Sequence, residues 1–175
     1  IGDVEDALLR IMAKCQKVSH PEWIARVEQL KAEEIATEKE LAAKNTQSIT
    51  PKQIFDIINA NKSDNTIVAT DVGQHQMWAA QYTQFGGPRQ FVSSGGLGTM
   101  GFGLGAAMGA YVATQQPSVL ITGDGSFGMN LNELATAVTY KIPLVIVLMN
   151  NGVLGMVRQW QTLFFKGHYS NTTLE

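Results

Sequence analysis

Residues 119–151 read VLITGDGSFGMNLNELATAVTYKIPLVIVLMNN. The apolar runs 119–121 and 144–149 predict β-strands, and the segment 131–140 between them predicts a helix. A strand–helix–strand unit of this size forms a right-handed parallel crossover. The carboxyl ends of the two strands therefore lie at the same edge of a parallel sheet.

Polar residues follow both strands at that edge. Asp124 and Asn151 each offer a hard oxygen atom, and the crossover brings them close together. Gly125 and Ser126 offer backbone N–H groups at the start of the next helical segment, where an anion is favoured. A carboxylate, an amide oxygen and a group of N–H donors suit a diphosphate carried by Mg²⁺. The stretch therefore predicts a site for a magnesium diphosphate.

The rest of the body repeats the same alternation of helix and strand. Strands are predicted at 66–70, 89–93 and 118–122, and a helix at 106–114. Alternation of this kind requires a parallel sheet with helices on both faces. An earlier helix opens at Thr50, the predicted N-cap, with proline as its first residue. Its predicted buried face consists of Ile54, Phe55, Ile57 and Ile58.

Residues 1–45 differ in composition from this body. They hold 16 of the 28 Asp, Glu, Lys and Arg residues, whereas 16 of the 17 glycines follow position 70. Helices are predicted at 7–17 and 21–44, with an apolar stripe that includes the single cysteine, Cys15. One cysteine cannot form a disulfide framework. We therefore predict a charged helical arm over residues 1–47 that precedes an α/β domain over residues 48–175.

Charge and hydropathy argue against two classes of partner. The net charge of −2 provides no electrostatic attraction to nucleic acid or to an anionic membrane. The apolar runs are also much shorter than the ~20 residues that a membrane-spanning helix needs. We expect a protein that binds neither.

The residues Gly96-Leu97-Gly98-Thr99-Met100-Gly101 match the G-x-G-x-x-G fingerprint of dinucleotide sites. Asp124 follows 23 positions later, close to the ~20 expected for the acid that binds ribose. A domain that binds NAD or FAD is therefore the alternative hypothesis. It leaves the strand at 66–70 without a role, since the fingerprint should follow the first strand, and it gives no function to Asn150-Asn151.

The segment from Gly123-Asp124-Gly125 to Asn150-Asn151 resembles the thiamine diphosphate motif, which has this beginning, end and approximate length. Four further segments are similar to the large catalytic subunit of acetolactate synthase (acetohydroxyacid synthase), namely 73–81, 88–90, 93–101 and 155–161. The resemblance covers about residues 50–173. It implies the thiamine diphosphate-binding fold, a three-layer α/β/α diphosphate domain that is incomplete at its C-terminus. Residues 1–47 would be the tail of a preceding domain and a linker.

The resemblance also implies roles for individual residues. Mg²⁺ would be held by Asp124, the side chain of Asn151 and the backbone carbonyl of Val153. Met100 would support the thiazolium ring from below, and Trp160 would line the substrate channel. The expected contacts of the cofactor are Val72, Gly73, Gln74, His75, Gly98, Met100, Gly123, Asp124, Gly125, Ser126, Asn151, Val153 and Met156.

The implied reaction is the decarboxylation of pyruvate and its condensation with a second pyruvate or with 2-ketobutyrate, in branched-chain amino-acid biosynthesis. A second copy of the catalytic subunit would supply the activating glutamate, and the whole enzyme would bind FAD and could associate with a regulatory small subunit. We therefore expect this chain alone to be inactive. A bacterial cytoplasmic enzyme is the default expectation. Another thiamine diphosphate enzyme of the pyruvate oxidase or carboligase type is the alternative within this class.

Overall fold

The computed structural model describes residues 2–44 and 48–174. The chain divides into two compact units, Ile1–Ser48 and Ile49–Glu175. The domain boundary predicted after residue 47 adjoins residues 45–47, which lie outside the described residues, as do Ile1 and Glu175.

The first unit consists of two helices, α1 (Val4–Lys14) and α2 (Pro21–Lys44). The side chain of Asp3 accepts a hydrogen bond from the backbone N–H of Asp6 at 3.0 Å, so α1 begins three residues earlier than predicted. Cys15, predicted inside the helix, is its exposed C-cap. Neither helix contains a buried residue. Of the helices in the described part of the chain, none has the length and apolar character needed to cross a membrane.

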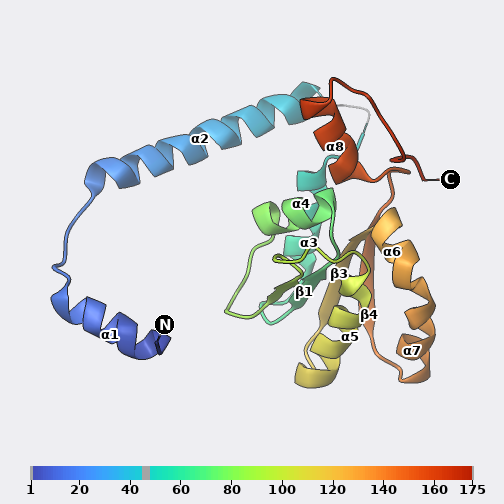
Figure 1. Ribbon diagram of the computed structural model, residues 1–175, viewed down its shortest axis with the longest axis horizontal. Helices are drawn as coiled ribbons and strands as arrows, with labels where there is room; N and C mark the ends of the chain where they lie inside the picture. Colours follow the sequence, from blue (N-terminus) through green and yellow to red (C-terminus); the bar gives the residue numbers. More distant parts are fainter. Residues whose placement is uncertain (1, 45–47, 175) are drawn as a thin grey trace. The chain divides into compact units, whose positions relative to one another are not determined.

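The described part of the second unit is built on a four-stranded parallel sheet (Figure 1). The strands are β1 (Ile67–Thr70), β2 (Phe91–Ser93), β3 (Ser118–Gly123) and β4 (Leu144–Met149). Their order is β2-β1-β3-β4, and each neighbouring pair is parallel. The predicted α/β fold is confirmed.

The strand order reverses direction once, beside β1. From β1 the chain passes to β2 on one side and then returns to β3 on the other. Open α/β sheets bind ligands at such a reversal, outside the carboxyl ends of the two strands concerned. The crevice expected from topology therefore lies between the ends of β1 and β3.

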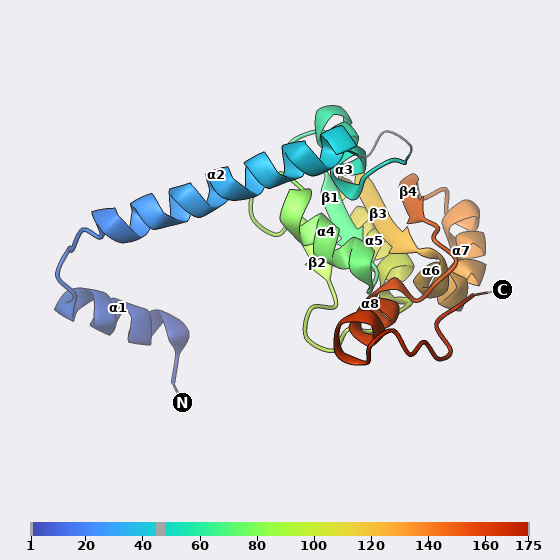
Figure 2. The ribbon, with the colours of Figure 1, turned by 90° about the horizontal axis from the view of Figure 1, so that it is seen from above.

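Helices cover both faces of the sheet (Figure 2). Successive strand residues point to opposite faces, so Val68 and Ile121 pack with one layer and Ala69 and Leu120 with the other. The first layer consists of α3 (Pro51–Asn61) and α4 (Gln74–Tyr82), and the second of α5 (Phe102–Thr114) and α7 (Leu134–Thr139).

Helix α3 begins as predicted. Thr50 is the N-cap, and its hydroxyl accepts a hydrogen bond from the backbone N–H of Gln53 at 3.3 Å. The Gln53 side chain accepts in return from the Thr50 N–H at 2.9 Å, which completes a capping box. Phe55 is fully buried, but the prediction was wrong for Ile57, which is 64% exposed. Two residues turn a helix by about 200°, so Ile57 faces away from Phe55.

The helix predicted at 131–140 has a different form. Residues 131–139 form a 3₁₀ turn at Leu131–Glu133 followed by α7, and a further helix, α6 (Asp124–Asn130), precedes them. Helix α5 begins at Phe102, four residues earlier than predicted. Its N-cap is Gly101, whose φ of +85° lies in the left-handed region that favours glycine.

Candidate functional site

The carboxyl ends of three neighbouring strands bring the predicted site residues together. Asp71 directly follows β1, Asp124 follows β3, and Asn150-Asn151 follow β4. The register pairs Thr70 with Ile121 and Gly123 with Met149, so the three strands end at one edge of the sheet. This edge is the position that the strand order marks for ligand binding.

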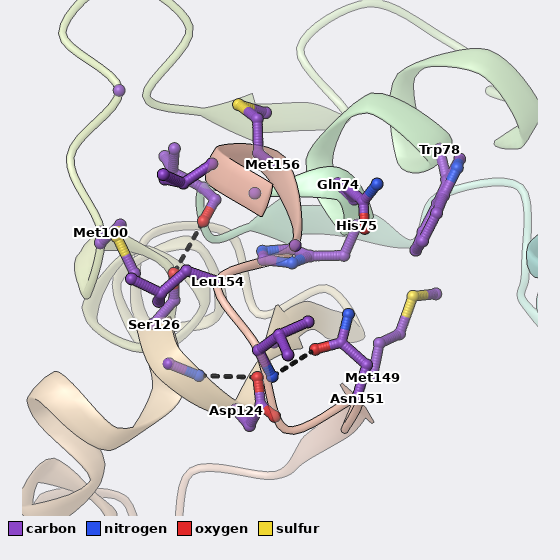
Figure 3. A pocket seen from close by; sticks show the side chains of 18 residues that line it. Gln74, His75, Trp78, Met100, Asp124, Ser126, Met149, Asn151, Leu154 and Met156 are labelled. Carbon is purple, nitrogen blue, oxygen red and sulfur yellow. Dashed lines mark hydrogen bonds between the residues drawn. The ribbon is translucent and has the colours of Figure 1, made fainter. Parts of the chain in front are cut away.

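A cavity of about 150 Å³ opens at this edge (Figure 3). All thirteen residues predicted to contact a cofactor line it. Residues that the sequence reasoning missed also line it, and they are Trp78, Met149, Leu154, Gly155 and Val157. The apolar character of the last four gave no signal beyond that of ordinary core residues.

Asp124 connects two turns at the rim of the cavity. Its Oδ1 accepts a hydrogen bond from the N–H of Gly125 at 2.9 Å, and its Oδ2 accepts from the N–H of Gly152 at 2.6 Å. Gly152 has a φ of +66°, which lets the chain turn back after Asn151. The turn is also closed by the Asn151 Oδ1, which accepts from the N–H of Val153 at 3.1 Å. The carboxylate therefore holds in place the segment that carries the other two predicted metal ligands.

The donor set fits a hard divalent cation. Asp124, Asn151 and Val153 offer a carboxylate, an amide oxygen and a backbone carbonyl, which are ligands that Mg²⁺ accepts. Within the described residues there is no cluster of three His, Cys, Asp or Glu side chains able to hold a metal. Zinc sites are built from sets of that kind, whereas a magnesium ion that is shared with a phosphate ligand needs only one or two carboxylates.

Ser126 links the β3 turn to the β1 turn. Its side chain is 1% exposed, and its hydroxyl donates to the carbonyl of Val72 at 2.8 Å. The hydroxyl hydrogen is therefore already engaged, and Ser126 would face an anion with its backbone N–H. A Cβ at the adjacent Gly125 would lie 2.8 Å from Leu154 Cδ2, so a side chain there would require the Leu154 side chain to move.

His75 is buried in the wall of the cavity and is 5% exposed. Burial lowers the pKa of His75 below 6.5. This effect is opposed only in part by the charge of Asp71, the backbone carbonyl of Asp71 and the charge of Asp124. The ring is therefore neutral at pH 7. Its Nε2 has no hydrogen-bond partner among the described residues. An unpaired buried nitrogen is costly, so the cavity wall is suited to a polar ligand that would pair with it.

Glycines hold the His75 ring from two sides. A Cβ at Gly73 would lie 2.7 Å from His75 Cε1, and a Cβ at Gly123 would lie 2.9 Å from His75 Nδ1. The φ of Gly123 is −111°, which other residues adopt easily. Only the contact with His75 therefore requires glycine at position 123.

We expect Gly123→Ala to lower the free energy of unfolding by about 1–3 kcal/mol, since an added methyl group must displace the imidazole. Gly105→Ala is the matched control, because a Cβ there meets no atom within 4 Å. Because alanine favours a helix more than glycine does, Gly105→Ala in α5 should instead raise the free energy of unfolding by roughly 0.5–1 kcal/mol. Urea unfolding monitored by circular dichroism measures both changes. A Gly123→Ala protein as stable as the parent would show that His75 is not held as described.

The glycine-rich loop before α5 brings Met100 to the cavity. Gly98 and Gly101 adopt left-handed conformations, with φ of +64° and +85°. A hydrogen bond from Asn130 stabilises the loop: its Nδ2 donates to the carbonyl of Gly101 at 2.6 Å. Sequence reasoning did not identify Asn130, which is a common surface residue type and lies 29 positions away.

The loop also bears on the dinucleotide alternative. The fingerprint follows β2, which is an edge strand, whereas a dinucleotide fingerprint follows the strand beside the reversal in strand order. Gly98 and Met100 reach the cavity, but Gly96 does not line it.

Helix α8 (Gly155–Phe164) closes one side of the site. Met156 lines the cavity, and Gln159 accepts a hydrogen bond from Gln74 at 2.9 Å. Trp160 does not line the cavity; it is 60% exposed and packs edge-to-face on Phe164, with ring centroids 5.5 Å apart. Its predicted place at a substrate channel stays a prediction.

Comparison with known proteins agrees with this geometry. Residues 71–175 match the family model "Thiamine pyrophosphate enzyme, C-terminal TPP binding domain". The chain is 56% identical to the acetolactate synthase isozyme 2 large subunit of Escherichia coli K12 over 124 residues, which are 70% of the chain and 22% of that protein. It is 40% identical over 180 residues to the acetolactate synthase large subunit of Corynebacterium glutamicum, covering 99% of the chain and 28% of that protein.

A plant protein is similar to the same degree. The chain is 48% identical over 128 residues to the chloroplastic acetolactate synthase 1 of Nicotiana tabacum, covering 73% of the chain and 19% of that protein. The chain thus spans between about a fifth and somewhat over a quarter of the length of these relatives.

Proposed function

Because this chain belongs to the thiamine pyrophosphate (thiamine diphosphate) enzyme family, with the family's C-terminal binding domain at residues 71–175, we propose that its second unit anchors the diphosphate of that cofactor through Mg²⁺. The observation that carries the proposal is the meeting of Asp124, Asn151 and Val153 with the unpaired Nε2 of His75 around one cavity. The cavity also lies where the strand order favours a ligand.

Different residues of the chain would contact the metal, the phosphate groups and the rings of the cofactor. Asp124, Asn151 and the carbonyl of Val153 would hold the metal, and the backbone N–H groups of Gly125 and Ser126 would face the phosphate oxygens. His75 would pair with a polar atom of the cofactor. The sulfur-bearing side chains of Met100 and Met156 line the same cavity and would pack on the apolar rings.

We further propose that the whole protein is an acetolactate synthase that joins pyruvate to a second pyruvate or to 2-ketobutyrate. The support is the similarity to acetolactate synthases, two of them large subunits, over most of the chain. The bound cofactor supplies the electron sink for decarboxylation of a 2-keto acid. This domain contributes anchoring and geometry. A second catalytic subunit, a regulatory subunit and FAD in the whole enzyme are parts of the same proposal.

Isothermal titration calorimetry of thiamine diphosphate into the chain tests the proposed site. We expect binding in the presence of Mg²⁺ that weakens at least about tenfold in EDTA, because the metal joins the acidic side chain to the anionic ligand. Parallel titrations with thiamine, which lacks the diphosphate, and with NAD serve as controls. Binding of thiamine diphosphate that ignores EDTA, or preferential binding of NAD, would contradict the proposal.

A further inference from the structure

Asp71 is a buried carboxylate for which the proposed function has no use. It directly follows β1, is 1% exposed and does not belong to the residues that line the cavity. The ion pairs of the described residues do not include it. A buried carboxylate without a cation needs compensation by hydrogen bonds.

Two structural elements, α5 and β3, supply those bonds. The Oδ1 of Asp71 accepts from the backbone N–H of Gly103 in α5 at 3.1 Å, and Oδ2 accepts from the hydroxyl of Thr122 in β3 at 2.9 Å. The backbone N–H of Asp71 donates to the carbonyl of Ile121 at 3.0 Å. One side chain thus joins the ends of β1 and β3 to the start of α5.

The atoms around this carboxylate are closely packed. A Cβ at Gly103 would lie 2.8 Å from the backbone nitrogen of Asp71, 2.9 Å from its Cγ and 2.7 Å from Leu120 Cδ1. Helix α5 can therefore approach the end of β1 only because residue 103 is glycine. Thr122 is fully buried beside it.

Each connected element leads within a few residues to the cavity. Gly103 follows Met100 by three residues, and Thr122 precedes Asp124 by two. In the segment that follows β1, Asp71 precedes His75 by four residues, and the charge and backbone carbonyl of Asp71 act on the His75 ring. A displacement of the Asp71 side chain would therefore also displace the segments that carry Met100, Asp124 and His75.

We propose that Asp71 is a positioning residue that sets the relative placement of the His75, Met100 and Asp124 segments for cofactor binding. The inference rests on the proposed function of the cavity. The two terminal atoms of the Asp71 side chain bond α5 and β3 at the same time, so this side chain keeps the three segments in register. Its contribution to affinity acts through those segments, without contact to the cofactor.

The first test compares three variants by calorimetric titration of thiamine diphosphate at saturating Mg²⁺, at a temperature where circular dichroism shows each to be folded. Asp71→Ala should weaken binding about tenfold or more, in line with losses seen for groups that orient metal ligands. Asp71→Asn should stay within about threefold of the parent, because the amide oxygen can still accept from Gly103 and the amide NH₂ can donate to Thr122. Asp56→Ala, an exposed aspartate paired with Lys52, is the control and should not change affinity.

A double-mutant cycle with Thr122→Val adds a readout that general destabilisation would not mimic. Both changes break the same link, so the double variant should bind about as weakly as Asp71→Ala alone. A folded Asp71→Ala protein with parental affinity, an Asp71→Asn protein as weak as Asp71→Ala, or fully additive losses would overturn the proposal.

A readout without ligand separates this inference from the proposed function. In Asp71→Ala, amide hydrogen exchange at residues 72–75 and 98–103 should accelerate about tenfold or more, and in Asp56→Ala it should not change. If the parent chain fails to bind thiamine diphosphate while exchange accelerates as expected, the proposed function fails and the positioning role of Asp71 stands. Unchanged exchange in Asp71→Ala would overturn that role.

Discussion

Asp124→Ala is expected to abolish Mg²⁺-dependent binding of thiamine diphosphate, with a loss of affinity of about 100-fold or more, above the 10–100-fold typical of residues that only orient ligands. Asp124 is the only carboxylate among the three proposed metal ligands, so its loss removes the one full negative charge that faces the cation. Alanine also releases the N–H of Gly152, which Asp124 Oδ2 holds at 2.6 Å. The turn that carries Asn151 and Val153 would then lose its anchor.

Asp124→Asn separates these two effects. The amide keeps one oxygen for the turn but carries no charge, so binding should be intermediate, at least about tenfold weaker than in the parent, since a neutral ligand attracts Mg²⁺ less. Calorimetric titration measures affinity, and thermal unfolding confirms that each variant is folded. Asp64→Ala, in an exposed turn, is the control and should bind as the parent does. Parental affinity in Asp124→Ala would exclude the proposed metal site.

Phe55→Ala is expected to cost about 3–5 kcal/mol of the free energy of unfolding, the range for removing a buried aromatic side chain. Phe55 is fully buried and packs with Val68, Ala79, Val119 and Ile121 between α3, α4 and the sheet. Its ring also lies 6.1 Å from that of Tyr82. The cavity left by alanine cannot collapse easily, because strands on one side and a helix on the other are held by backbone hydrogen bonds.

Ile57→Ala, two residues further along the same helix, provides the comparison. Ile57 is 64% exposed, so its loss should change stability by no more than about 0.5 kcal/mol. Urea unfolding monitored by circular dichroism measures both variants. Equal losses would show that α3 does not present the face described here.

Much of the fold follows from local patterns in the chain. Runs such as Leu144–Met149 predicted strands because continuous apolar sequences suit a parallel sheet buried on both faces. Thr50 and Pro51 predicted the start of α3 because a side-chain acceptor and a fixed φ favour a helix N-terminus. Helix boundaries were less accurate where a glycine outside the periodic pattern, such as Gly101, ends a loop.

The sequence also predicted that the site residues lie close together, because strands in a parallel sheet place their carboxyl ends at one edge. That rule is enough to bring Asp124 to Asn151 and to add the loop of Gly73 and His75. It does not require knowledge of any distance between side chains. The residue types at strand ends, together with the parallel arrangement, predicted Asp124, Gly125, Ser126 and Asn151, whereas the full set of thirteen lining residues was implied by the family resemblance.

Other features depend on contacts between residues far apart in the chain. The order β2-β1-β3-β4 puts the reversal between β1 and β3, and no local pattern encodes which strands become neighbours. Asp71 meets Gly103 and Thr122 across 32 and 51 positions, and Asn130 meets Gly101 across 29. These pairs form only after the layers have packed, because packing sets which backbone groups come within hydrogen-bond distance. Local sequence thus specifies the elements and the chemistry at their ends, whereas the packing of helices on the sheet specifies which of those ends hold one another in place.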